Sequence, residues 1–157
     1  MKSPNHNARR LGPPDMVVIH YTGMKTAAAA CARLCDPSSE VSAHWMIHLD
    51  GRAEALVDEA RRAWHAGVAS WGGKSDVNSR SIGIELVNCG HEHGYHPFPE
   101  PQMAALERLL HEIMARWPVL ARNVVGHEHV APGRKIDPGE KFDWDRLVRQ
   151  GLATARN

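Results

Sequence analysis

The sequence predicts an α/β (α+β) fold, a single domain with a central mixed β-sheet flanked by helices. Short β-branched runs alternate along the chain with segments of helical periodicity, which is the pattern of strands and helices packed in layers. The chain has 157 residues, of which 43% are hydrophobic and 24% charged. This length and composition suffice for one ordinary buried core, but not for two independent ones.

The chain begins with a polar segment. Residues 1–15 are rich in Pro and Gly, which predicts an N-terminal arm lying on the surface, with the folded domain spanning residues 16–157. Met16–His20 is a β-branched run typical of a buried strand, and it ends where Gly23 permits a turn. His20 therefore lies at the end of a strand, where a side chain can face a cleft.

An alanine-rich helix is predicted next. Thr26 can cap its first turn, and Asp36-Pro37 ends it because a proline disfavours helical geometry in the residue before it. Residues 44–49 and 53–57 then predict two strands joined by the turn pair Asp50-Gly51.

The middle of the chain combines a loop, a strand and a long helix. Residues 66–80 contain several Gly and Ser and are expected to form a long loop. In the predicted strand 81–87, alternation puts Glu85 on the face opposite the most apolar side chains. From 101 to 117, apolar residues recur at steps of three and four, which predicts a helix with one buried stripe.

The last part of the chain adds a strand and a helix. Val124-Val125 is a short β-branched strand that leads to His127. Residues 128–142 contain several Pro and Gly and are expected to form a loop, after which Asp143 can cap the final helix.

Charge and hydropathy argue against two classes of function. The net charge is +1 and the basic residues are scattered, unlike the basic tract of a nucleic-acid or membrane-surface binder. No apolar run approaches the about 20 residues of a membrane span, and the first residues lack the apolar stretch of a secretory signal. We therefore expect a cytoplasmic monomer with no nucleic-acid partner and no membrane span.

Two clusters of metal-binding residue types have ordinary explanations. Cys31 and Cys35 lie one helical turn apart, which suits two reduced thiols packed on one helix face, and the third cysteine has no partner left. The three histidines of His91–His96 have a spacing that matches no closed zinc site, so a polar loop near a groove is the better interpretation.

His20 and His127 both lie where a β-branched strand ends, and Asp137 follows ten positions after His127. These positions alone indicate a site only weakly. The chain has 11 histidines, and a single histidine is more often a surface or hydrogen-bonded residue than a metal ligand.

Five motifs strengthen the case. In order, they are VVIHYTG (17–23), VSAHW (41–45), AWHAG (63–67), SIGIELVN (81–88) and VGHEHVAPGRKIDPG (125–139). Together they resemble the AmpD/AmiD type of N-acetylmuramoyl-L-alanine amidase, a family that also includes phage amidase lysozymes and peptidoglycan recognition proteins. The resemblance covers roughly residues 5–152 and implies an amidase/PGRP-like fold.

The resemblance implies a metal site and a reaction. His20, His127 and Asp137 match the family's zinc ligands, and three protein ligands leave a fourth position for water, as in catalytic zinc sites. One Zn²⁺ per chain is therefore expected. The implied reaction is hydrolysis of the amide between the lactyl group of N-acetylmuramic acid, ordinary or 1,6-anhydro, and L-alanine in peptidoglycan or muropeptides, by metal-activated water.

Further residues receive roles from the same resemblance. Glu85 matches the catalytic glutamate that moves a proton from water to the leaving nitrogen, and Lys135 matches a lysine that stabilises the tetrahedral intermediate. The implied substrate contacts are Trp64, His65, Trp71 and Asn78. The ordinary alternatives are a solvated strand carboxylate, a loop lysine and core tryptophans.

Two other functions fit the same fold. One is a peptidoglycan-binding module without catalysis, and the other is an amidase that also regulates a partner protein. The presence of all three implied ligands favours catalysis. The sequence His20-Tyr-Thr-Gly is closer to the AmiD branch, whose members are usually exported lipoproteins, so location and substrate range stay open. Residues 128–130 also depart from the family's usual Ser-Asp-Ile, but they only flank a ligand.

Overall fold

A five-stranded sheet in the order β4-β3-β6-β2-β7 forms the centre of the fold. The computed structural model of the protein describes residues 1–156. The strands are β2 (Met16–Tyr21), β3 (Trp45–Ile47), β4 (Ala53–Ala55), β6 (Ser81–Leu86) and β7 (Val124–Gly126). β2 runs parallel to β6 and β7, β3 runs parallel to β6, and β4 pairs antiparallel with β3. The predicted fold class, with a mixed central sheet, is confirmed.

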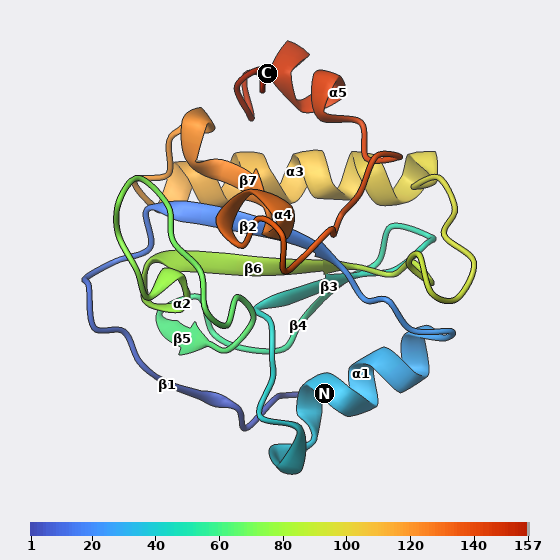
Figure 1. Ribbon diagram of the computed structural model, residues 1–157, viewed down its shortest axis with the longest axis horizontal. Helices are drawn as coiled ribbons and strands as arrows, with labels where there is room; N and C mark the ends of the chain where they lie inside the picture. Colours follow the sequence, from blue (N-terminus) through green and yellow to red (C-terminus); the bar gives the residue numbers. More distant parts are fainter. Residues whose placement is uncertain (157) are drawn as a thin grey trace.

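Helices flank this sheet, with α3 and α5 on one side and α1 toward the other (Figure 1). They are α1 (Ala27–Cys35), α2 (Val77–Arg80), α3 (Glu100–Arg116), α4 (His127–Val130) and α5 (Trp144–Arg149), with 3-10 turns at Pro37–Ser39 and Ala121–Asn123. The predicted apolar stripe of α3 joins Ile82 and Ile84 of β6 in the largest buried cluster. The opposite face of β6 carries Gly83 and Glu85, so the core side and the polar side of the sheet are separated by strand alternation.

Local signals set several of the element boundaries. The Thr26 side chain accepts a hydrogen bond from the backbone N–H of Ala29 and caps α1 as predicted. The Asp143 side chain caps α5 in the same way. The expected loops 66–80 and 128–142 differ from the prediction because the first contains the four-residue helix α2 and the second overlaps the four-residue helix α4. A single turn has too few residues to produce a helical period in the sequence.

The N-terminal residues are anchored more firmly than their composition suggests. β1 (His6–Ala8) pairs antiparallel with β5 (Arg61–Ala63). Asn5 is buried, and its side-chain amide donates to the carbonyls of Asp36 and Val41, each at 2.8 Å. Arg9 donates to the carbonyls of Glu59, Ser79 and Ser81. Residues 1–15 therefore form an outer layer that is bonded to the rest of the domain.

The His44 side chain links β5 to β6 and is fully buried. Its Nε2–H donates to the Arg61 carbonyl and its Nδ1 accepts from the Gly83 N–H, both at 2.9 Å. Burial, which dominates over the raising effect of the Arg61 carbonyl, lowers the pKa of His44 to about 4. At this pKa the ring is neutral in the folded protein and must lose its bonding pattern to accept a second proton.

This buried imidazole predicts a loss of stability in acid. The unfolded chain binds a proton at His44 near pH 6.5, whereas the folded chain does so near pH 4, so lowering the pH through this window favours unfolding, by up to roughly 3 kcal/mol from this group. Urea unfolding of the metal-free protein at pH 7 and pH 4.5 measures the change. His44→Gln, which cannot titrate, should lose less stability over the same interval. Equal losses in the two proteins would contradict the assignment.

Candidate metal centre and active site

Parallel strands bring polar residues from distant parts of the chain to one edge of the sheet. His20 and Glu85 are paired neighbours on β2 and β6. His127 directly follows β7, which pairs with the other side of β2. Asp137 lies in the loop after α4. Ligands in open α/β sheets bind at this carboxyl edge of the strands, and the structure gathers the implied ligand set there.

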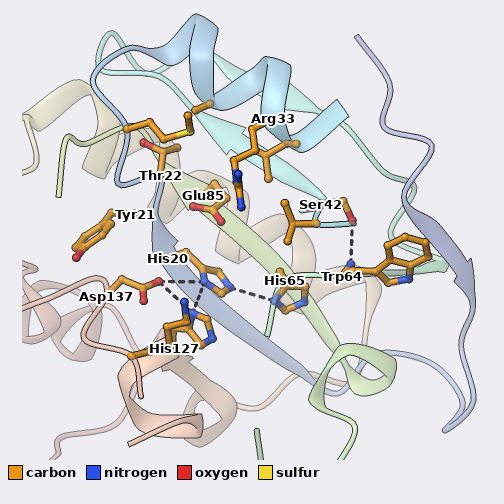
Figure 2. Close-up of a pocket in the computed structure, with 15 residues that line it drawn as sticks. His20, Tyr21, Thr22, Arg33, Ser42, Trp64, His65, Glu85, His127 and Asp137 are labelled. Atoms are coloured by element: carbon orange, nitrogen blue, oxygen red, sulfur yellow. Dashed lines mark hydrogen bonds and ion pairs between the residues drawn. The ribbon is translucent and has the colours of Figure 1, made fainter. Parts of the chain in front are cut away.

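His20, His127 and Asp137 meet at one point (Figure 2). The Nδ1 atoms of the two histidines are 3.0 Å apart, and Asp137 Oδ2 lies 3.1 Å from the first and 3.3 Å from the second. All three residues are buried, with exposed fractions of 2%, 5% and 7%. A buried cluster of this kind needs a positive charge or shared protons to hold its acceptor atoms together.

Neighbouring groups favour the acceptor form of this cluster. The Nε2 of His127 lies 3.0 Å from the Ala66 carbonyl, which can only accept, so the ring proton is on Nε2 and the Nδ1 lone pair faces the cluster. Burial first, and then the charge of His127, lower the pKa of His20 to about 4. Burial would raise the pKa of Asp137, but the contacts with His127 and His20 outweigh it and lower the pKa below its ordinary value. At neutral pH His20 is therefore neutral and Asp137 is ionised.

The chemistry and spacing of these donors fit a zinc ion. Two imidazole nitrogens and one carboxylate oxygen are zinc ligands, and bonds of about 2.0 Å in a tetrahedron put ligand atoms about 3.3 Å apart. The three separations of 3.0, 3.1 and 3.3 Å are close to that value. Among residues 1–156, the ligand atoms of His20, His127 and Asp137 lie within 4.8 Å of one another, so these three side chains could hold one metal ion.

Glu85 lies beside the cluster as a carboxyl group without a bonding partner. Its Oε2 is buried and has no hydrogen bond from any residue within 1–156. Burial first, and then the negative charge of Asp137, raise the pKa of Glu85 well above its ordinary value, while the Lys135 ammonium opposes the shift. Such a group is suited to accept and return a proton near neutral pH.

These residues line a pocket of about 250 Å³. His20, His127, Asp137, Glu85 and Lys135 all contribute to its wall. Arg33 of α1 also lines it and extends toward Glu85 (Figure 2). Arg33 could not be identified as a site residue from the sequence, because an exposed arginine on an alanine-rich helix has no pattern that distinguishes it from an ordinary solvated residue.

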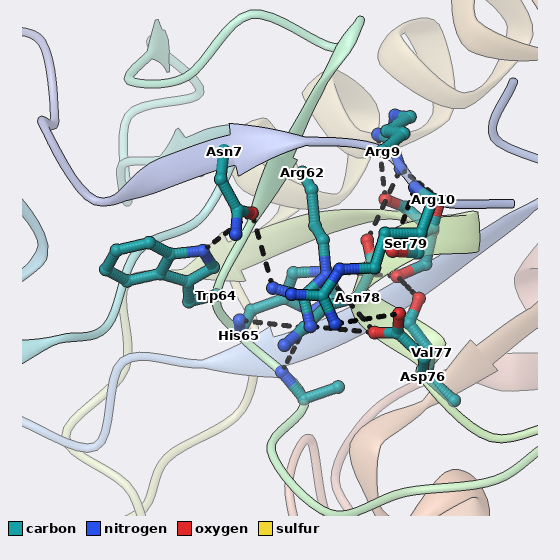
Figure 3. Close-up of polar contacts among 12 residues, drawn as sticks. Asn7, Arg9, Arg10, Arg62, Trp64, His65, Asp76, Val77, Asn78 and Ser79 are labelled. Atoms are coloured by element: carbon teal, nitrogen blue, oxygen red, sulfur yellow. Dashed lines mark hydrogen bonds and ion pairs between the residues drawn. The ribbon is translucent and has the colours of Figure 1, made fainter. Parts of the chain in front are cut away.

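The four implied substrate contacts have different positions. Trp64 and His65 line the pocket, whereas Trp71 and Asn78 do not. The Trp71 indole N–H donates to the side-chain oxygen of Asn123 at 3.1 Å. The Asn78 side chain is directed toward the backbone of the pocket segment, where its Oδ1 accepts from the N–H groups of His65 and Ala66 (Figure 3). The structure thus brings together all three implied ligands, both implied catalytic residues and two of the four implied contacts.

A comparison with protein families decides the relationship. The model of the N-acetylmuramoyl-L-alanine amidase family matches residues 10–140. This chain belongs to that family. The matched range contains His20, His127 and Asp137, and also the pocket residues Glu85 and Lys135.

Individual amidases are similar to this family member over most of its length. The N-acetylmuramoyl-L-alanine amidase AmiD of Escherichia coli is 38% identical over 149 residues, covering 87% of this chain and 53% of AmiD. The 1,6-anhydro-N-acetylmuramyl-L-alanine amidase AmpD of Haemophilus influenzae is 41% identical over 109 residues, covering 69% of this chain and 57% of AmpD. The chain thus spans little more than half the length of these two curated relatives.

Solved structures of the same family superpose on this fold. A crystal structure of a selenomethionine derivative of AmpD matches with a TM-score of 0.85 at 32% identity, covering 98% of this chain and 93% of the other. AmiD of E. coli in complex with the substrate anhydro-N-acetylmuramic acid-L-Ala-D-gamma-Glu-L-Lys matches with a TM-score of 0.83 at 36% identity, covering 92% and 61%.

Several expected features lie outside the group formed by His20, His127 and Asp137 in this amidase-family chain. All three cysteines are free thiols, and Cys31 and Cys35 pack against a buried cluster as expected. His91 lies in a loop, where its Nε2 contacts Glu140 at 2.9 Å, in line with a polar loop. Across residues 1–156, the structure contains no helix with the length and apolar character needed to cross a membrane.

Proposed function

We propose that this chain is a zinc-dependent N-acetylmuramoyl-L-alanine amidase. It would hydrolyse the amide between the lactyl group of N-acetylmuramic acid, or its 1,6-anhydro form, and L-alanine of peptidoglycan or muropeptides. The observation that carries this proposal is the convergence of three acceptor side chains, His20, His127 and Asp137, beside the unpartnered carboxyl group of Glu85 in one pocket. Family membership and the substrate named for the AmiD complex support the choice of amide.

Each pocket residue has a role that its chemistry permits. A zinc ion held by His20, His127 and Asp137 would supply Lewis acidity and lower the pKa of a water molecule. Glu85 would accept the proton of the attacking water and return it to the leaving nitrogen of L-alanine. The ammonium group of Lys135 would stabilise the negative charge that develops on the carbonyl oxygen. Trp64 is retained as a substrate contact, whereas Trp71 and Asn78 would act only through the segments that they hold.

Arg33 provides a proposed contact for the peptide part of the substrate. It lines the pocket, and its guanidinium has no hydrogen-bond or ion-pair partner in the described chain. A glutamate linked through its γ-carboxyl group, as in the substrate named for the AmiD complex, keeps a free α-carboxylate on the residue that follows L-alanine. A guanidinium is suited to bind such a carboxylate.

Arg33→Gln should therefore raise KM for a muropeptide with a free glutamate α-carboxylate by about 2- to 5-fold, the range of a solvent-accessible ion pair, with little change in kcat. Steady-state kinetics on the free acid and on the same peptide carrying an α-amide tests this. The variant and the unaltered protein should have equal KM values for the amide. An unchanged KM for the free acid would remove Arg33 from this role.

Product analysis tests the proposed function as a whole. Zinc-loaded protein is incubated with anhydro and ordinary N-acetylmuramyl tripeptides, and the products are followed by mass spectrometry. We expect addition of one water, release of a peptide with a free L-alanine amino terminus, and loss of the reaction on chelation. Binding of the muropeptides by zinc-loaded protein without any cleavage would instead support the binding module. The expected cytoplasmic location and monomeric state stay predictions.

A further inference from the structure

We propose that His65 is a positioning residue that fixes the proton of His20, so that the His20 Nδ1 lone pair is available to a metal ion. The proposal rests on the proposed function in one respect, that a metal ion is what the acceptor cluster holds. It replaces the substrate contact that the family resemblance implies for His65.

The chain of hydrogen bonds begins at the Val77 carbonyl. Ser81 Oγ lies 2.6 Å from this oxygen, which can only accept, so the Ser81 hydroxyl proton is used there. Ser81 Oγ must then accept from His65 Nε2 at 3.0 Å. A neutral imidazole has one N–H, so once His65 Nε2 holds the proton, His65 Nδ1 is an acceptor.

The acceptor at His65 Nδ1 determines which nitrogen of His20 carries the proton. His65 Nδ1 and His20 Nε2 are 3.0 Å apart, and the acceptor on His65 requires the proton to be on His20 Nε2 (Figure 2). His20 Nδ1 is then left with a lone pair that faces Asp137. An outer hydrogen bond of this kind sets the tautomer and the ring orientation of a metal-binding histidine.

The other histidine of the cluster is oriented by the adjacent residue of the same segment. His127 Nε2–H donates to the carbonyl of Ala66, so one dipeptide, His65-Ala66, orients both imidazoles. Asn78 fixes this dipeptide by accepting from both of its backbone N–H groups, at 3.0 and 2.8 Å (Figure 3). Two ligands that are 107 positions apart in the sequence thus depend on one short segment.

A glycine in β6 provides the space for the His65 ring. A Cβ atom placed on Gly83 would lie 2.5 Å from His65 Cγ, 2.6 Å from Cδ2 and 2.8 Å from Nδ1. The ring therefore lies directly against the strand backbone, where no side chain fits. Glycine in a strand interior weakens the strand and often marks a close approach of this kind.

Zinc affinity measures the role of His65 without using the amidase reaction. Competition with a chromogenic chelator is carried out on the full chain. His65→Ala should weaken zinc binding by about 10- to 100-fold, the usual effect of losing an outer partner. His65→Asn, whose side-chain oxygen can accept at the position of Nδ1, should restore most of the affinity. Gly83→Ala should weaken binding as well, and His111→Asn on the exposed face of α3 is the matched control with no expected change.

The outcomes separate this inference from the proposed function. Absence of zinc binding in the unaltered protein would count against the metal centre itself. Zinc binding in His65→Ala equal to that of the unaltered protein would overturn the inference about His65 and leave the proposed function standing. If KM for muropeptide is raised at this unchanged zinc affinity, His65 is a substrate contact instead. If His65→Ala does not fold, Ser81→Ala provides the test. This substitution removes the acceptor of the His65 Nε2–H, so the ring proton of His65 is no longer fixed on Nε2. Zinc binding should weaken by a smaller factor than in His65→Ala, and an unchanged zinc affinity would contradict the proposal.

Discussion

Asp137→Ala should remove tightly bound zinc and lower kcat/KM on a muramyl peptide by about three to four orders of magnitude. Asp137 is the only negatively charged member of the cluster, and its Oδ2 contacts the Nδ1 atoms of His20 and His127 at 3.1 and 3.3 Å. Without it, only the two imidazoles of the group remain, and two ligands without a negative charge hold a zinc ion far more weakly. Zinc per chain after desalting, together with the hydrolysis rate, measures both effects.

The control for this experiment is a carboxylate of the pocket loop outside the cluster. Glu140→Gln removes an exposed charge that pairs with His91, and it should leave zinc content and rate nearly unchanged. An Asp137→Ala protein that retains one zinc per chain and a rate within tenfold of the unaltered protein would show that Asp137 is not a ligand.

Glu85→Gln should lower kcat by about two to four orders of magnitude while zinc content stays at one per chain. The amide has the size of the carboxyl group but cannot carry a proton from water to the leaving nitrogen. Folding should tolerate the change, because Glu85 Oε2 has no hydrogen bond to lose within residues 1–156. Steady-state kinetics and metal analysis on the same sample separate the two properties. A variant with full turnover would remove Glu85 from the proton-transfer role.

Much of the fold could be predicted because its signals are local. The β2 strand lies between two parallel neighbours and is buried, so it shows as an unbroken β-branched run. The apolar period of α3 and the Thr26 cap of α1 each depend on residues within a few turns. The helices α2 and α4 were not predicted, because four residues give no period.

The N-terminal arm shows why other features could not be predicted. Asn5 and Arg9 are polar residues in a Pro- and Gly-rich segment, and they bond to backbone carbonyls 31 to 72 positions away. Every residue has a backbone carbonyl, so the pattern of side chains in the sequence does not indicate which carbonyl a distant polar side chain will bind. The same limit applies to the burial of His44, which depends on Arg61 and Gly83.

The candidate site was likewise predicted only in part from the sequence. Motifs identified His20, His127, Asp137, Glu85 and Lys135, which the structure brings into one pocket. Motifs could not separate Trp64, which lines the pocket, from Trp71, which lies in the same segment but outside it. The direction of the bond between His65 and His20 required the position of Ser81, sixteen residues further along the chain.

X-ray absorption at the zinc edge of the zinc-loaded full chain tests the metal centre most directly. We expect two imidazole nitrogens and oxygen donors near 2.0 Å, in a four-coordinate shell that includes one ligand from solvent. A sulfur neighbour near 2.3 Å would contradict the account, because it would place the ion at a cysteine, as would a shell of four protein ligands with no solvent.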